Sequence, residues 1–258
     1  MGSPLPGGIG AERDPRVSSR RLSRALTAAA LGLFALGPLV LGGGRPAEAQ
    51  EHGGKGKPAP VRACRTQAPQ KFLERRSYLH KGVLDLKKQA KAVRYLAERY
   101  GRVDSEATMQ WNKQPALAQA KTVRFMGLPL SVHARIAPAL ACVEKRILDT
   151  CTRKSRYTPR AVGGFRSANT YRGVEVSNHL FGIAIDVDPD RNPCCGCVDP
   201  WPSNPVCKNQ GSVYKRTALP KCWINAFERF GFDWLGHDTL EDTMHFEFLG
   251  DPARIAKK

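Results

Sequence analysis

The chain has 258 residues, a hydrophobic content of 41% and a formal net charge of +18. This length suffices for one domain with a hydrophobic core plus an extension. A charge this positive favours an anionic polymer as a partner through long-range attraction. The sequence contains no recognisable nucleic-acid-binding module, which argues against nucleic acid as that partner.

Residues 1–49 have the pattern of a secretory signal peptide. Three arginines precede the uncharged apolar run from Ala25 to Leu41, and Ala47-Glu48-Ala49 is a small-x-small cleavage site. The run is shorter than the roughly 20 residues of a spanning helix and contains Pro38, which argues against an uncleaved anchor. We therefore expect export to the periplasm or the extracellular space, no stable membrane anchor, and a soluble monomer after cleavage.

The next part of the chain reads as a linker followed by a helical segment. Residues 50–60 are rich in Gly, Lys and Pro, as in a flexible linker. Residues 70–101 carry apolar side chains at roughly helical spacing until Gly101. We expect residues 61–121 to form a helical N-terminal extension, with His80 on its surface.

The middle of the chain predicts short strands around one long helix. Residues 122–128 suggest a strand or hairpin, and residues 131–151 suggest a helix capped by Ser131. His133 lies off the apolar stripe of that helix, so we expect it on the surface. Residues 160–166 read as a strand that leads to Arg166.

The last third predicts two strands, a short helix and a long loop. Residues 182–188 alternate, which places Asp186 opposite an Ile/Val face. Residues 244–248 alternate as well, with His245 and Glu247 on one face. Between these strands, residues 189–221 are rich in Pro, Gly and Cys and read as a loop, and residues 222–230 suggest a helix.

All eight cysteines follow the signal peptide. An even count in an exported protein suggests up to four disulfides, but eight cysteines allow 105 connectivities and the sequence does not choose among them. A structural zinc site is the alternative for the four cysteines that lie closest together in the sequence. These are Cys194, Cys195, Cys197 and Cys207.

Three residues have the chemistry of a catalytic zinc site. His179 and Asp186 flank Gly182, a position where the backbone can bend, and His245 follows in the last strand. Two imidazoles and one carboxylate leave a fourth zinc position open for water. We expect these residues to bind Zn²⁺. The alternative is a set of core and surface residues without a metal.

Charged residues near these ligands have candidate catalytic roles. Asp242, three residues before His245, is our candidate base, because it can take a proton from a water acidified by zinc and pass it to the leaving amine. Glu241 and Glu247 compete for this role. Glu247 also has the strand parity to accept a hydrogen bond from His245. Arg166 is a candidate to stabilise an oxyanion or bind a substrate carboxylate, and a surface ion pair is its alternative.

These motifs resemble those of the zinc D-Ala-D-Ala carboxypeptidase family, in the VanY-like branch that includes L-Ala-D-Glu endopeptidases. The similarity covers roughly residues 122–250. Four sequence elements carry it: the SxHxxGxAxD pattern at Ser177, His179, Gly182, Ala184 and Asp186; Asp242, His245 and Phe246; Gly231, Phe232 and Trp234; and Gly164-Phe165-Arg166-Ser167.

The resemblance implies a zinc metallopeptidase domain over residues 122–252 with a hedgehog/DD-peptidase-like α+β fold. A small antiparallel sheet would carry the zinc, with helices on its flanks and a disulfide-rich loop. The implied reaction is hydrolysis of an amide bond next to a D-residue in peptidoglycan stem peptides, with Ser177 and Arg166 contacting the substrate.

The chain departs from the family in two places. The cysteine-rich stretch 189–222 lies between two ligands, where we expect a lid or a wall of a substrate subsite. The base is Asp242, where the vancomycin-resistance carboxypeptidases commonly have Glu, which favours the endopeptidase branch. Two alternatives remain: a non-catalytic zinc-containing module that binds the cell wall, and a disulfide-rich structural wall protein. Asp242 argues against the module, because a pure binder needs no spare carboxylate.

Overall fold

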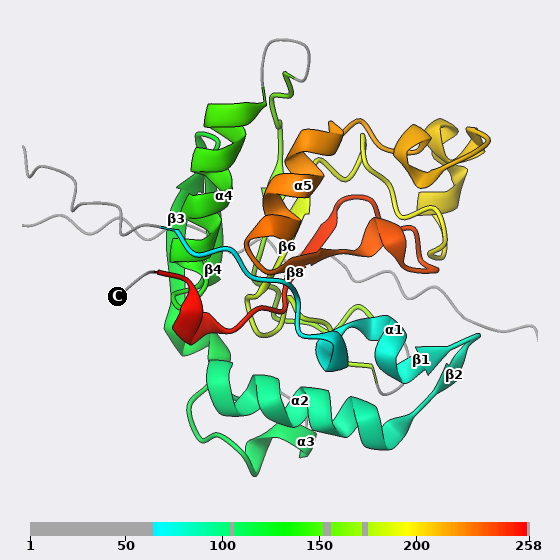
Figure 1. The fold of residues 1–258 in the computed structure, drawn as a ribbon. Coiled ribbons are helices and arrows are strands. Elements are labelled where there is room, and N and C mark those ends of the chain that lie inside the picture. The colour runs from blue at the N-terminus through cyan, green and yellow to red at the C-terminus, as the bar shows by residue number, and fades with distance from the viewer. Residues whose placement is uncertain (1–63, 104–105, 152–155, 172–174, 257–258) are drawn as a thin grey trace, which may run out of the picture. The chain divides into compact units, whose positions relative to one another are not determined.

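The computed structural model describes residues 64–103, 106–151, 156–171 and 175–256. These residues belong to one compact unit, and the ribbon of its elements is drawn in Figure 1. The predicted signal peptide 1–49 and linker 50–60 lie outside the described residues. Within the described ranges, no helix is long and apolar enough to cross a membrane.

The N-terminal part combines helices with one small hairpin. Its elements are the short helix α1 (Arg75–Tyr78), the hairpin β1 (Leu79–His80) and β2 (Val83–Leu84), helix α2 (Leu86–Tyr100) and the short helix α3 (Glu106–Met109). The side chain of Asp85 caps α2 by accepting a hydrogen bond from the amide of Lys88. The helix expected over 70–101 is therefore continuous only from Leu86, because Gly82 has a φ of 80° in the turn of the hairpin.

A second hairpin precedes the central helix. Strands β3 (Ala120–Phe125) and β4 (Leu128–His133) pair antiparallel, and helix α4 (Ala137–Thr150) follows. The predicted helix over 131–151 was thus wrong at its start: Ser131 lies in β4 and caps no helix. Residues 128–132 alternate in burial, with Leu130 and Val132 buried, and this two-residue period specifies a strand.

His133 is buried rather than exposed, which corrects the surface prediction. Its Nε2 atom lies 3.0 Å from the carbonyl oxygen of Tyr100, and its Nδ1 accepts a hydrogen bond from the amide of Arg135 at 3.1 Å. Both ring nitrogens are therefore satisfied inside the protein by a neutral imidazole.

A four-stranded antiparallel sheet forms the centre of the second half. Its order is β5 (Val162–Gly163), β6 (Ala184–Val187), β8 (His245–Phe248) and β7 (Phe232–Trp234). Helix α5 (Lys221–Arg229) lies beside α4 (Figure 1) and also packs against β7. Phe227 of α5 stacks on Phe246 of β8 at a ring distance of 4.0 Å. The predicted α+β class, with helices beside a small antiparallel sheet, is confirmed.

All eight cysteines form disulfides. Cys64 pairs with Cys142 and Cys151 with Cys222, so two bridges tie α4 to the segment before α1 and to the start of α5. The other two bridges, Cys194–Cys197 and Cys195–Cys207, lie within the predicted loop, which contains only short 3₁₀ turns. The alternative of a structural zinc site at these four cysteines is therefore not observed.

Candidate metal centre and active site

Two of the three predicted ligands, Asp186 and His245, lie on neighbouring strands. Asp186 of β6 is the direct partner of His245 of β8 in the antiparallel register. Directly opposed residues project their side chains from the same face of a sheet. Every residue of both strands is buried. The sheet thus places an imidazole beside a carboxylate inside the protein.

A tight turn before β6 brings the third residue to the same place. The amide of His179 points to the Ser177 hydroxyl oxygen at 3.4 Å, and the amide of Gly182 donates to the carbonyl of His179 at 3.0 Å. Gly182 has a φ of 66°, and a Cβ atom there would collide with the ring of Phe165. Glycine is needed here for the turn and for the close approach of Phe165.

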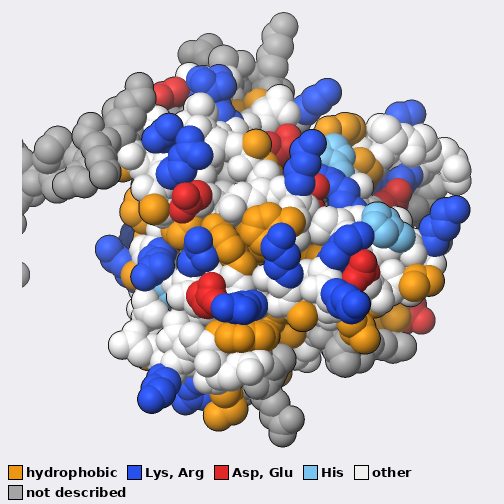
Figure 2. Space-filling model, turned by 60° about the horizontal axis from the view of Figure 1, so that its bottom comes forward, with side chains coloured by type: hydrophobic (Ala, Val, Ile, Leu, Met, Phe, Trp, Pro, Cys, Tyr) orange, Lys and Arg blue, Asp and Glu red, His pale blue; other side chains and the backbone are white. Residues whose placement is uncertain are grey.

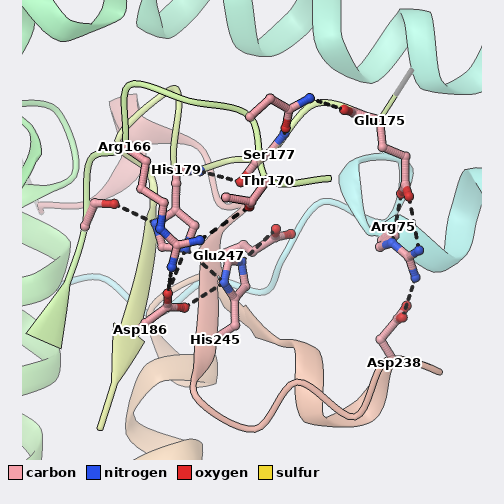
Figure 3. Close-up of polar contacts among 12 residues, drawn as sticks. Arg75, Arg166, Thr170, Glu175, Ser177, His179, Asp186, Asp238, His245 and Glu247 are labelled. Atoms are coloured by element: carbon pink, nitrogen blue, oxygen red, sulfur yellow. Dashed lines mark hydrogen bonds and ion pairs between the residues drawn. The ribbon is translucent and has the colours of Figure 1, made fainter. Parts of the chain in front are cut away.

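The three side chains converge, as Figure 3 shows. His245 Nδ1 lies 2.9 Å from Asp186 Oδ1, and His179 Nε2 lies 3.2 Å from Asp186 Oδ2. The two imidazole nitrogens are 3.1 Å apart. All three residues are at most 3% exposed, and one ligand atom from each lies within 4.8 Å of the others. We call His179, Asp186 and His245 the histidine–aspartate cluster.

The outer ring nitrogens fix the protonation of this cluster. His179 Nδ1 lies 2.6 Å from the carbonyl oxygen of Gly164, and His245 Nε2 lies 3.0 Å from Glu247 Oε1. Both oxygens are acceptors, so each outer nitrogen donates a proton to its oxygen. Without a second proton, the inner nitrogens present lone pairs to each other and to Asp186. Two imidazoles and one carboxylate are a donor set that fits a divalent transition-metal ion.

The pKa shifts within the cluster also indicate a site for a cation. Burial lowers the pKa of His179. Burial opposes ionisation of Asp186, yet hydrogen bonds and charge from both histidines outweigh it and lower its pKa. Burial also opposes charge on His245, but its bonds to Asp186 and Glu247 raise its pKa well above the usual value. Without a metal, the cluster therefore favours a second proton on His245, and a metal cation would take the place of that proton.

Asp242 lies beside the cluster with a free acceptor atom. It is 8% exposed, and its Oδ1 atom is buried without a hydrogen-bond partner in the part of the chain that the structure describes. Burial raises the pKa of this carboxyl to about 7, and the charge of Asp186 adds to the shift. A buried carboxylate with a pKa near neutrality has the property required of a general base.

The structure separates the two competitors of Asp242. Glu241 points away and binds the guanidinium of Arg216 through two contacts of 2.8 and 2.5 Å. Glu247 accepts the hydrogen bond from His245 Nε2, as its strand parity predicts. Asp242 is therefore the one of these three carboxylates that lines the cavity beside the cluster.

Arg166 and Ser177 also lie at the site. The Arg166 guanidinium contacts Asp186 Oδ2, with Thr170 Oγ1 3.5 Å away, and its side chain is 39% exposed. Ser177 is buried, and its hydroxyl is directed at the His179 amide. Both residues line the cavity, where a substrate could reach them. Their roles toward a substrate stay predictions.

A cavity of about 290 Å³ opens over the cluster and Asp242. The cysteine-rich segment expected to form a lid or a wall contributes Cys194, Cys197, Val198 and Trp201 to its lining. Sequence reasoning did not single out Trp201, Thr170 or Tyr171. An aromatic residue between two prolines, as in Pro200-Trp201-Pro202, was the available signal for Trp201. Nothing comparable distinguishes Tyr171.

Residues 171–248 match the family model described as D-alanyl-D-alanine carboxypeptidase. The match contains the histidine–aspartate cluster and Asp242, whereas Arg166 precedes it. No curated protein and no solved structure matches the chain. The resemblance of this chain to the D-alanyl-D-alanine carboxypeptidase family is thus confirmed over residues 171–248, the segment that carries the candidate metal ligands and the candidate base.

Proposed function

We propose that this protein is a secreted zinc metallopeptidase that hydrolyses amide bonds next to D-amino acids in peptidoglycan stem peptides. We also infer the hedgehog/DD-peptidase-like arrangement of this family for its fold. One observation carries the proposal: the cluster of three buried acceptors lies beside a carboxylate whose Oδ1 has no partner among the described residues. The family match supplies the peptidase class.

His179, Asp186 and His245 would hold the zinc. Two imidazoles and one carboxylate leave a coordination position open, as catalytic zinc sites do. When bound, Zn²⁺ would act as a Lewis acid toward the scissile carbonyl and acidify a water molecule. Hydrogen bonds to the Gly164 carbonyl and to Glu247 would keep the two imidazoles in the ligating tautomer.

Side chains in the cavity wall would transfer the proton and contact the substrate. Asp242 would receive a proton on Oδ1 and return it to the leaving amine, for which a pKa near 7 is suited. Arg166, at the mouth and partly exposed, would stabilise negative charge on the substrate oxygen or bind a substrate carboxylate. Ser177 would contact the substrate from the turn that carries His179.

Asp242 distinguishes this proposal from a binding module of the same fold. Burying a carboxylate without a hydrogen bond is costly, and a module that only binds the wall gains nothing from it. An enzyme gains a proton acceptor. The alternative reading, a non-catalytic zinc-containing wall-binding module, therefore ranks second.

Export and an anionic partner belong to the same proposal. Four disulfides suit an oxidising compartment, and the sequence of residues 1–49 suits a signal peptide. Figure 2 shows a face on which Lys and Arg outnumber Asp and Glu and surround hydrophobic patches. Such a surface would attract peptidoglycan or another anionic polymer of the cell wall.

Mass spectrometry of purified stem peptides after incubation with the mature protein, with and without a chelator, tests the proposal. Chelator-sensitive loss of a terminal D-Ala would identify a carboxypeptidase. Chelator-sensitive cleavage after L-Ala would identify an endopeptidase, which Asp242 in place of Glu favours. Stoichiometric zinc without any cleavage would overturn the peptidase and favour the binding module.

A further inference from the structure

Arg75 connects the N-terminal part of the chain to both walls of the cavity. It lies in α1, outside the segment that matches the family model, and its side chain is 9% exposed. Its Nε and Nη2 atoms lie 2.8 and 3.2 Å from the carboxylate of Glu175, and its Nη1 lies 2.6 Å from Asp238 Oδ1. Figure 3 shows the guanidinium between the two carboxylates. We call these three residues the Arg75 cluster.

Glu175 belongs to the wall that carries the substrate-facing residues. Its carbonyl oxygen accepts a hydrogen bond from Asn169 Nδ2 at 2.6 Å. The Oδ1 atom of Asn169 accepts in turn from the amides of Ser177 at 3.1 Å and Tyr171 at 3.3 Å. Arg75 thus reaches two cavity-lining residues through a continuous path of hydrogen bonds.

Asp238 belongs to the wall that carries the candidate base. Its Oδ1 atom accepts from the amide of Leu240 at 3.1 Å, and its carbonyl accepts from the amide of Glu241 at 3.0 Å. The same turn closes with the amide of Asp242 donating to the carbonyl of Leu235 at 3.1 Å. The carboxylate that binds Arg75 therefore orders the turn that ends at Asp242.

The charges make this connection strong. One guanidinium offers five N–H donors in a planar fork, which suits one bidentate and one single carboxylate contact. Glu175 and Asp238 are both largely buried, with side chains 17% and 6% exposed. Without Arg75, the carboxylates of Glu175 and Asp238 would be two buried negative charges without this guanidinium between them. Their repulsion would separate the segments that carry them.

We propose that Arg75 is a positioning residue of the active site and that the N-terminal segment is part of the catalytic domain. Arg75 sets the distance between the wall with Ser177 and Tyr171 and the turn with Asp242. This inference rests on the proposed peptidase function and deepens it. It also moves the boundary of the functional domain from residue 122 to before Arg75.

The test compares Arg75→Lys and Arg75→Met with Arg76→Met as the matched control. Arg76 is the next residue, and it pairs with Glu74 and Asp233 through a side chain that is 45% exposed.

We expect kcat to fall about 10- to 100-fold in both Arg75 variants, because a misplacement of about 1 Å is this costly. Zinc affinity should stay within about threefold, because strands and a separate turn hold the cluster, and Arg76→Met should stay near wild type. Unchanged kcat and KM in Arg75→Met would overturn the proposal.

Two further measurements cover the other outcomes. If Arg75→Met fails to fold, the triple variant R75M/E175Q/D238N removes all three charges together, and its kcat should still be reduced, whereas wild-type kcat would overturn the proposal. Hydrogen exchange needs no activity and therefore separates this inference from the peptidase function. Faster exchange at residues 175–179 and 238–242 in Arg75→Lys supports positioning even if no peptide is cleaved. Unchanged exchange there overturns it.

Discussion

The histidine–aspartate cluster and the Arg75 cluster are both buried groups of ionisable side chains, and Figure 3 draws them in one view. In the Arg75 cluster the chain supplies the cation, and every charged contact is made within the protein. In the histidine–aspartate cluster the outer nitrogens donate to Gly164 and Glu247, so only an added proton or a metal ion can join the inner nitrogens to Asp186. The nearest guanidinium, Arg166, is partly exposed and contacts only one oxygen of Asp186.

This difference shows how a site can be distinguished from a structural ion pair. Burial and perturbed ionisation occur in both places and do not separate them. The cavity that opens on the histidine–aspartate cluster does, together with the ligand atoms that could hold a cation from outside the chain. The predictions below follow this contrast.

Loss of an inner ligand should have the largest effect. His245→Ala removes a ligand and leaves Asp186 with one imidazole, so stoichiometric zinc binding should disappear along with all activity. The zinc content after dialysis measures this loss of binding. The control is His80→Ala, which changes an exposed histidine. Retention of one zinc per chain in His245→Ala would refute the ligand assignment.

Asp242→Asn should separate metal binding from turnover. The amide keeps the size of the side chain but accepts no proton at neutral pH, so kcat should fall by about 10²- to 10⁴-fold while zinc stays bound. Steady-state kinetics and zinc content on the same sample check both halves. Glu241→Gln, which alters a carboxylate paired with Arg216, should remain close to wild type. Near-normal turnover in Asp242→Asn would rule out this carboxylate as the base.

Glu247→Gln should weaken the metal without removing it. The neutral side chain is a poorer acceptor for His245 Nε2, so the imidazole becomes less basic and less firmly oriented. We expect zinc affinity to fall about 10- to 100-fold. Competition with a chromogenic chelator measures this, with Glu98→Gln on the surface of α2 as control. Equal affinities in the two variants would contradict the contact.

The smallest effect concerns a buried histidine without a metal role. Burial lowers the pKa of His133 to about 4, below its ordinary 6.5. The unfolded chain then binds more protons in this interval, so stability is complete above pH 6.5 and is lost as the pH falls toward 4. Between pH 6.5 and 5.5 the free energy of unfolding should drop by about 1 kcal/mol from this group. Urea unfolding of wild type and His133→Gln measures it, with His80→Gln as control. Parallel pH dependences would show that His133 is not the source.

The core of the site could be predicted because its determinants are local. The alternation around Asp186 and around His245 specified two strands, and the structure pairs these residues directly. The start of α4 was missed because Ser131 resembles an N-cap when the two-residue period of 128–132 is overlooked. The burial of His133 was missed because its partner, the carbonyl of Tyr100, lies 33 residues away.

The packing around the site depends on long-range partners. Cys64 and Cys142 are 78 residues apart, and Arg75 and Glu175 are 100 residues apart. No periodicity in one sequence reports such pairs, because they are fixed by the packing of α1, α4 and the loops. The charge of Arg75 carried no signal among the many basic residues of this chain.

The register of β6 and β8 would make metal binding depend on correct folding. A shift of one residue would turn either Asp186 or His245 to the opposite face of the sheet. Only the native pairing therefore offers both donors to one ion. At a free metal concentration about 1,000-fold above its dissociation constant, this preference stabilises the native pairing by about 4 kcal/mol. New chains that meet too little metal would lack this stabilisation and be the more readily degraded.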